Sequence, residues 1–127
     1  MPFDPKNYDS SWDDDNQELW DEKYAEWEKR DWKSWFTENL TFPFVVKRED
    51  DEDDVYFESG AASKPFRLGH TMEVTGIEYE DDLRGVIVNV KEGQNTGNVP
   101  LCDVTVMKKS NINYWPVHEY AVWFANR

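Results

Sequence analysis

Six consecutive carboxylates, Glu49-Asp50-Asp51-Glu52-Asp53-Asp54, are the residues of this 127-residue chain whose type and spacing most clearly suggest chemistry. An apolar run, Phe42-Pro43-Phe44-Val45-Val46, precedes them, and Val55-Tyr56-Phe57 follows them. Six adjacent ionised side chains repel one another at neutral pH. A chain keeps such a run either as a solvated loop or as a place where a bound cation relieves the repulsion. The residues alone leave both interpretations open.

Calcium is the cation that such a run suits best. Ca²⁺ takes ~6–8 oxygen ligands, and carboxylates and backbone carbonyls of a flexible loop supply them. The run does not fit an EF-hand, because an EF-hand pattern started at Asp50 has Val55 where glycine is required and Ala61 where glutamate is required. We therefore identify a candidate calcium site of another type, with these ligands: Asp50, Asp51, Glu52, Asp53 and Asp54.

A second acidic stretch, from Glu78 to Asp82, is predicted to be a turn between two strands. It could face the first stretch across the fold. Its carboxylates are expected either to form a second, weaker calcium site or to complete the first one. These candidate ligands are Glu78, Glu80, Asp81 and Asp82.

The charge of the chain is concentrated in its first half. The formal net charge is −13, and residues 1–58 hold 19 acidic and 7 basic side chains, against 8 and 7 in residues 59–127. Nucleic acids and anionic membranes both require basic surface, so neither is expected as a partner. The alternative to a calcium site is a protein-interaction module whose acidic half docks a basic partner protein.

The sequence gives little support to catalysis. The two histidines, His70 and His118, have no zinc-ligand spacing, and one cysteine, Cys102, is too few for a thiolate zinc site. No nucleophile elbow, P-loop or dinucleotide fingerprint is present. Acidic residues are too abundant to select a pair for glycoside hydrolysis. We expect a protein that is not an enzyme.

The elements that must position the acidic stretches follow from apolar periodicity. One helix is predicted over 17–39, with a possible break near Asp31, and a short strand over 41–47. A long loop is predicted over 48–65. Alternating patterns predict strands over 71–76, 85–91 and 99–107, and helical spacing of aromatic residues predicts a short helix over 118–126.

These elements predict an α+β fold, in which an N-terminal helix packs on a small antiparallel SH3-like β-barrel and a short C-terminal helix or turn closes one end. We expect residues 1–30 to be a partly helical N-terminal extension and residues 31–127 to be a single domain. No signal peptide or membrane span is predicted, and Cys102 cannot form an internal disulfide, so the expected location is cytoplasmic.

Four motifs in this order resemble the CcbP-type calcium-binding protein family, best known from cyanobacteria. They are Trp32-x-x-Trp35-Phe36-x-x-x-Leu40-x-Phe42-Pro43-Phe44, Leu68-Gly69-x-x-Met72-x-Val74-x-Gly76-Ile77, Gly85-Val86-x-Val88-x-Val90 with Val99-Pro100-Leu101-x-Asp103-Val104, and Tyr120-x-x-Trp123-Phe124-Ala125-Asn126-Arg127. The resemblance covers residues 32–127.

The resemblance implies a small acidic protein that binds calcium without an EF-hand, through a helix leading into a compact β-barrel-like domain. It also implies a role as a calcium buffer or sensor. The chain departs from the family pattern in two places, because Val45-Val46-Lys47 and His70 stand where the family has acidic residues. The run from Glu49 to Asp54 is the candidate replacement.

Overall fold

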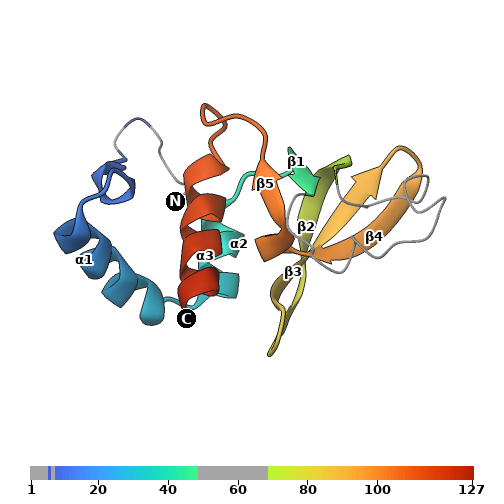
Figure 1. Ribbon diagram of the computed structural model, residues 1–127. Helices are drawn as coiled ribbons and strands as arrows, with labels where there is room; N and C mark the ends of the chain where they lie inside the picture. Colours follow the sequence, from blue (N-terminus) through green and yellow to red (C-terminus); the bar gives the residue numbers. More distant parts are fainter. Residues whose placement is uncertain (1–5, 7, 49–68) are drawn as a thin grey trace.

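The computed structural model describes residue 6, residues 8–48 and residues 69–127, and it has an α+β architecture (Figure 1). The elements in chain order are a 3₁₀ helix η2 (Ser11–Asp13), α1 (Gln17–Glu28), α2 (Trp32–Asn39), β1 (Phe44–Arg48), β2 (Thr71–Asp81), β3 (Gly85–Glu92), β4 (Asn95–Pro100), a 3₁₀ helix η5 (Leu101–Asp103), β5 (Val104–Val106) and α3 (Tyr114–Asn126). The predicted α+β class is confirmed.

The N-terminal helical region divides near Asp31, as the sequence suggested. Asn16 begins α1 by accepting a hydrogen bond from the Leu19 N–H on its side-chain oxygen, at 3.2 Å. The Asp31 carboxylate begins α2 in the same way, because it accepts from the backbone N–H and the hydroxyl of Ser34, at 3.4 and 3.1 Å. Short acceptor side chains at these positions satisfy amide groups that have no partner within the helix. None of the described helices is both long enough and apolar enough to cross a membrane.

The strands form one antiparallel sheet in the order β4-β3-β2-β1-β5. The expected closed barrel is not found, because the described strands β4 and β5 are the two open edges of this sheet. A connection of only three residues, Leu101–Asp103, nevertheless joins these two edges. Such a connection spans roughly 10 Å. The sheet is therefore strongly curved although it is not closed.

The prediction of one continuous strand over 99–107 was wrong, because η5 interrupts this stretch. Val99 and Leu101 are buried at odd positions, whereas Val104 and Val106 are buried at even positions. A continuous strand turns every second side chain to the same face. The 3₁₀ turn restores the inward direction for Val104 and Val106, and this allows the chain to cross from one edge of the sheet to the other.

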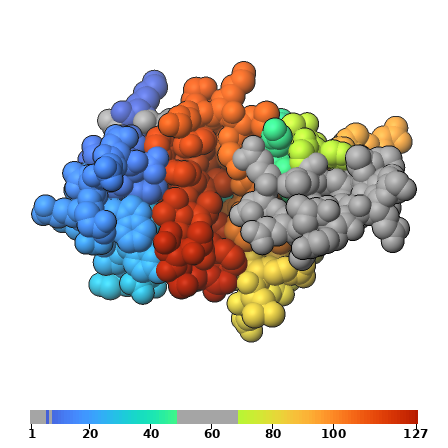
Figure 2. All heavy atoms as spheres, viewed as in Figure 1, coloured from blue at the N-terminus to red at the C-terminus, as the bar shows by residue number. Residues whose placement is uncertain are grey.

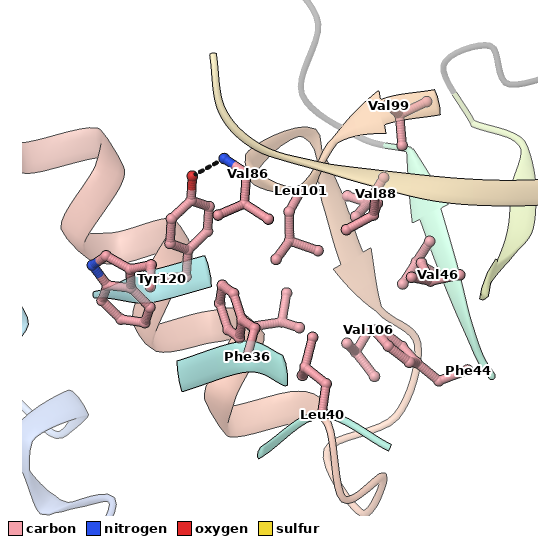
Figure 3. Close-up of a cluster of buried hydrophobic side chains, with 14 of the residues drawn as sticks. Phe36, Leu40, Phe44, Val46, Val86, Val88, Val99, Leu101, Val106 and Tyr120 are labelled. Atoms are coloured by element: carbon pink, nitrogen blue, oxygen red, sulfur yellow. Dashed lines mark hydrogen bonds between the residues drawn. The ribbon is translucent and has the colours of Figure 1, made fainter. Parts of the chain in front are cut away.

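Helices α2 and α3 cover the concave, apolar side of the sheet. Figure 3 shows Phe36 of α2, Leu40 directly after α2, and Tyr120 of α3 meeting valines of β1, β3 and β5. The Tyr120 hydroxyl accepts a hydrogen bond from the backbone N–H of Val86 at 2.9 Å. Helix α3 has 13 residues and begins at Tyr114, earlier than predicted. Its length lets it contact α1, α2, η5 and β5.

The molecule thus has three layers, with α3 between α1 and the sheet (Figure 1). Trp12 and Trp27 belong to the same buried cluster as the strand valines and have 3% and 0% of their surface exposed. Burial of an aromatic side chain of this size is a large apolar contribution to folding. The helical layer of residues 8–28 is therefore packed on the rest of the chain through its aromatic side chains.

Asn113 joins the turn that follows β5 to the segment that leads into β1. Its side chain accepts from the Thr41 N–H at 2.7 Å and donates to the Thr41 carbonyl at 2.9 Å, and only 2% of its surface is exposed. We expect Asn113→Ala to lower the free energy of unfolding by about 1–3 kcal/mol, because it removes both hydrogen bonds from a buried position. Urea denaturation measures this.

The matched control is Asn126→Ala. Asn126 is exposed, and its side-chain amide donates only to the Val122 carbonyl of its own helix. Its loss should change stability by no more than about 0.5 kcal/mol. Equal effects of the two substitutions would contradict the role given to Asn113.

Candidate metal centre

The first group of candidate ligands, Asp50, Asp51, Glu52, Asp53 and Asp54, lies outside the described residues. The positions that flank this part of the chain are described and are joined to each other. The Arg48 N–H donates to the His70 carbonyl at 3.0 Å, and the Gly69 N–H donates to the Arg48 carbonyl at 2.7 Å. Arg48 and Gly69, the described residues on either side of 49–68, therefore lie together at one end of the β1–β2 pair.

Two carboxylates that the sequence patterns did not single out as ligands lie beside these flanking positions. Asp103 of η5 is 3.3 Å from the Arg48 guanidinium, and Glu92 at the end of β3 is 3.0 Å from the His70 imidazole. Asp103 belongs to the Val-Pro-Leu-x-Asp element, which was the available signal for it. No signal in the sequence marked Glu92, because its position depends on strand register.

The second group of candidate ligands does not form the predicted turn. Residues 78–81 continue β2, which pairs with β3 as far as Asp81 and Gly85, and the turn itself is Asp82-Leu83-Arg84. The strand extends because Tyr79 pairs with Ile87, which is buried. β2 also carries register shifts near Gly76 and Tyr79. Bulges of this type increase local twist.

The Asp81 carboxylate already has backbone partners. It accepts from the N–H groups of Arg84 and Leu83, at 2.9 and 2.7 Å. These two hydrogen bonds hold the pKa of the Asp81 carboxyl below its usual value of 3.8. These hydrogen bonds fix the turn, and they direct the Asp81 Oδ1 atom toward the backbone of the turn instead of toward solvent.

The lowered pKa of Asp81 has a consequence for the turn. A carboxyl whose pKa is lower in the folded than in the unfolded state stabilises the fold above its unfolded pKa, and this contribution is lost as the pH falls through the folded pKa. We expect an NMR titration of the native protein to show the Asp81 carboxyl titrating below 3.8, and the same carboxyl titrating near 3.8 in urea. Identical midpoints in both states would contradict the two hydrogen bonds.

The two acidic stretches are far apart along β2. Lys47 pairs with Thr71 at the start of β2, and Asp81 ends it ten residues later. Ten residues of strand span roughly 30 Å. The second acidic stretch therefore lies at the end of β2 that is far from Arg48, the last described residue before the first stretch.

Within residues 8–48 and 69–127, no three His, Cys, Asp or Glu side chains converge in a way that could hold a metal ion. The chemistry of the run from Glu49 to Asp54 does fit calcium, because all six side chains offer hard oxygen donors. In the described structure, backbone hydrogen bonds join the two sides of this run in the sequence, Arg48 before it and Gly69 and His70 after it.

Comparison with known proteins gives one match. A family model, Calci_bind_CcbP, described as calcium binding, matches residues 16–124. No curated protein and no solved structure matches the chain.

Proposed function

The chain belongs to the CcbP family of calcium-binding proteins, and from this membership we propose that it is a calcium buffer whose main site is the run from Glu49 to Asp54. Family membership carries the assignment of calcium, and the donor chemistry of the run carries the assignment of the site. The proposed ligands are Asp50, Asp51, Glu52, Asp53 and Asp54.

The proposed mechanism is electrostatic. Adjacent carboxylates raise the free energy of the calcium-free state through mutual repulsion, and a bound divalent cation removes this repulsion. The fixed backbone pair of Arg48 and His70 keeps both ends of the acidic segment together, so binding need not close the loop. This arrangement supports uptake of calcium without a large rearrangement of the sheet.

A second, weaker site is proposed at the far end of β2, with Glu78, Glu80, Asp81 and Asp82 as its donors. The separation along β2 supports two independent sites over one shared site. The backbone hydrogen bonds of Asp81 support the lower affinity, because calcium would compete with the Leu83 and Arg84 amides for that carboxylate.

Buffering is preferred to sensing for a structural reason. A sensor couples ion binding to an element with two arrangements. The described core is already packed by side chains of all five strands and of α2 and α3, such as Val46, Val74 and Val88, which are fully buried. We place the buffer in a reducing compartment such as the cytosol, because a single cysteine, Cys102, cannot form an intrachain disulfide.

Isothermal titration with Ca²⁺ and with Mg²⁺, in the presence of about 0.1 M NaCl, tests this proposal. We expect saturable Ca²⁺ uptake that survives the salt, and Mg²⁺ binding at least about tenfold weaker, because Mg²⁺ demands a stricter octahedral geometry. Uptake that declines steadily with NaCl and does not distinguish the two ions would reject a coordination site.

A second candidate function is docking of a basic partner protein. One observation favours it: the tip of the β2–β3 hairpin projects from the surface (Figure 2) and carries Leu83 with 83% of its surface exposed, between Asp82 and Arg84 and close to Asp81. An exposed apolar side chain with a charged rim suits protein contacts. Such docking should weaken as NaCl rises, with no preference between Ca²⁺ and Mg²⁺.

A further inference from the structure

The segment from Tyr8 to Asp13, here called the strap, lies across α1 and α3 on the side away from the sheet (Figure 1). The Trp12 ring packs edge-on against the Trp27 ring at 5.2 Å between centroids, and stacks on the His118 ring at 5.6 Å. The Tyr8 ring stacks on the Trp115 ring at 5.2 Å. Two aromatic side chains, four residues apart, therefore occupy slots between the two helices.

Three polar contacts set the register of the strap. The Tyr8 hydroxyl donates to the carboxylate of Glu119. The same hydroxyl accepts from the Trp12 indole N–H at 2.6 Å. The Asp13 carboxylate lies 3.3 Å from the His118 imidazole. Burial, together with the neighbouring Glu119 charge, raises the pKa of Tyr8, so its hydroxyl stays protonated and remains a donor.

The buried carboxylate beneath the strap keeps hydrogen-bond partners without it. Glu119 is 2% exposed, and its carboxylate also accepts from the Trp27 indole at 2.7 Å, from Arg30 at 3.0 Å and from Lys23 at 3.4 Å. These three donors come from α1 and from the residues that follow it. A buried carboxylate is costly only when it is left without partners. Departure of Tyr8 therefore leaves Glu119 with its compensating partners.

The connection between the strap and α1 favours detachment. Asp13, Asp14 and Asp15 are consecutive, exposed and of like charge. Asp15 has φ of 61°, in the left-handed region that costs a non-glycine residue conformational energy. An open groove of about 390 Å³ lies beside the strap, and its lining includes Trp12 of the strap and Lys23 and Glu26 of α1.

We propose that the surface between α1 and α3 is a peptide-binding groove that the strap keeps closed. Its occupant is a segment of a partner protein that presents Tyr and Trp four positions apart, with a carboxylate directly after the Trp. Trp27, Trp115 and His118 bind the two rings, Glu119 accepts the tyrosine hydroxyl, and His118 faces the carboxylate. The groove lies on the other side of α3 from the sheet, and the proposal does not rest on the calcium site.

A labelled peptide with the sequence of residues 6–15 tests the groove in the full-length chain. We expect fluorescence anisotropy to show the peptide binding to the variant Tyr8→Ala/Trp12→Ala at least about tenfold more tightly than to the unmodified chain, because a tethered strap competes at high effective concentration. A peptide with alanine in place of its Trp should not bind. Absence of binding to a variant whose circular dichroism stays native overturns the proposal.

A milder variant keeps the test decisive if the double variant does not fold. Tyr8→Phe removes only the hydroxyl that reaches Glu119 and keeps the ring on Trp115. Its peptide affinity should lie between those of the other two proteins, and an affinity equal to that of the unmodified chain overturns the proposal. Size-exclusion chromatography that shows a stable dimer resistant to the peptide would assign the groove to the strap of a second copy and would also overturn it.

Discussion

Changing Asp51, Asp53 and Asp54 together to asparagine is expected to abolish tight calcium uptake. The substitutions keep the size of each side chain and one oxygen on each, but they remove three of the six adjacent charges in the run. Calcium affinity in proteins is set largely by the number of charged ligands. We expect a loss of about 100-fold or more in isothermal titration, which corresponds to about 2.7 kcal/mol of binding free energy.

The matched control removes the same number of charges from the other acidic stretch. Glu78→Gln/Glu80→Gln/Asp82→Asn neutralises the other acidic stretch and should leave the tight uptake unchanged, removing at most a weaker binding step. Without calcium, the variant of Asp51, Asp53 and Asp54 should be at least as stable as the unmodified chain, because repulsion is reduced. The reverse result, tight uptake lost only in the control, would move the main site to the end of β2.

Gly85→Ala is expected to be the most damaging small substitution in the fold, lowering the free energy of unfolding by at least about 3 kcal/mol. A Cβ at Gly85 would lie 2.0 Å from the Tyr120 hydroxyl and 2.8 Å from the Phe124 ring, and the residue has φ of 75°. The Tyr120 hydroxyl cannot move away easily, because it accepts from the Val86 N–H in a buried site. Denaturant unfolding followed by tryptophan fluorescence measures the effect.

Gly93→Ala separates the two causes of the destabilisation expected for Gly85→Ala, which are the collision of the new Cβ and the positive φ. Gly93 also has a positive φ, of 63°, but a Cβ at this position would meet no atom within 4 Å. It should cost only about 1 kcal/mol, the conformational part alone. The double variant Gly85→Ala/Tyr120→Phe should be less destabilised than the sum of its single variants, since the nearest colliding atom is gone. Additive effects would mean that the collision with the Tyr120 hydroxyl does not cause the destabilisation by Gly85→Ala.

Local signals in the sequence were sufficient for the N-terminal helical region, for β1 and for β3. Asp31 indicated a possible break, and its carboxylate does begin α2. The alternation of Val86, Val88 and Val90 correctly predicted β3. These features depend on capping and on side-chain period, which operate within a few residues.

Features that depend on distant contacts were predicted less well. The change from buried odd to buried even positions between Leu101 and Val104 was visible in the sequence, yet its meaning required knowing that the chain crosses between two edges of the sheet. The charge of the stretch from Glu78 to Asp82 indicated a turn, but only Asp82 belongs to the turn. Residues 78–81 continue as strand, since backbone pairing with β3 tolerates exposed carboxylates on a projecting hairpin.

The buried polar residues were missed for the same reason. Glu119 is the one acidic residue in the aromatic helix α3, and that isolation was a usable signal. Its donors, Lys23, Trp27 and Arg30, are about 90 positions away, so no short-range pattern connects them. The candidate calcium ligands from Asp50 to Asp54 lie outside the described residues and stay a prediction from donor chemistry and family membership.

The most direct test of the calcium assignment is an NMR titration that follows each Asp and Glu side-chain carboxyl carbon as Ca²⁺ is added. We expect the carboxyl signals of residues 50–54 to shift first and to saturate together, and those of Glu78, Glu80, Asp81 and Asp82 to shift only at higher Ca²⁺ concentration. Saturation of the second group first, or shifts spread evenly over the acidic residues of the whole chain, would contradict a calcium site at the acidic run.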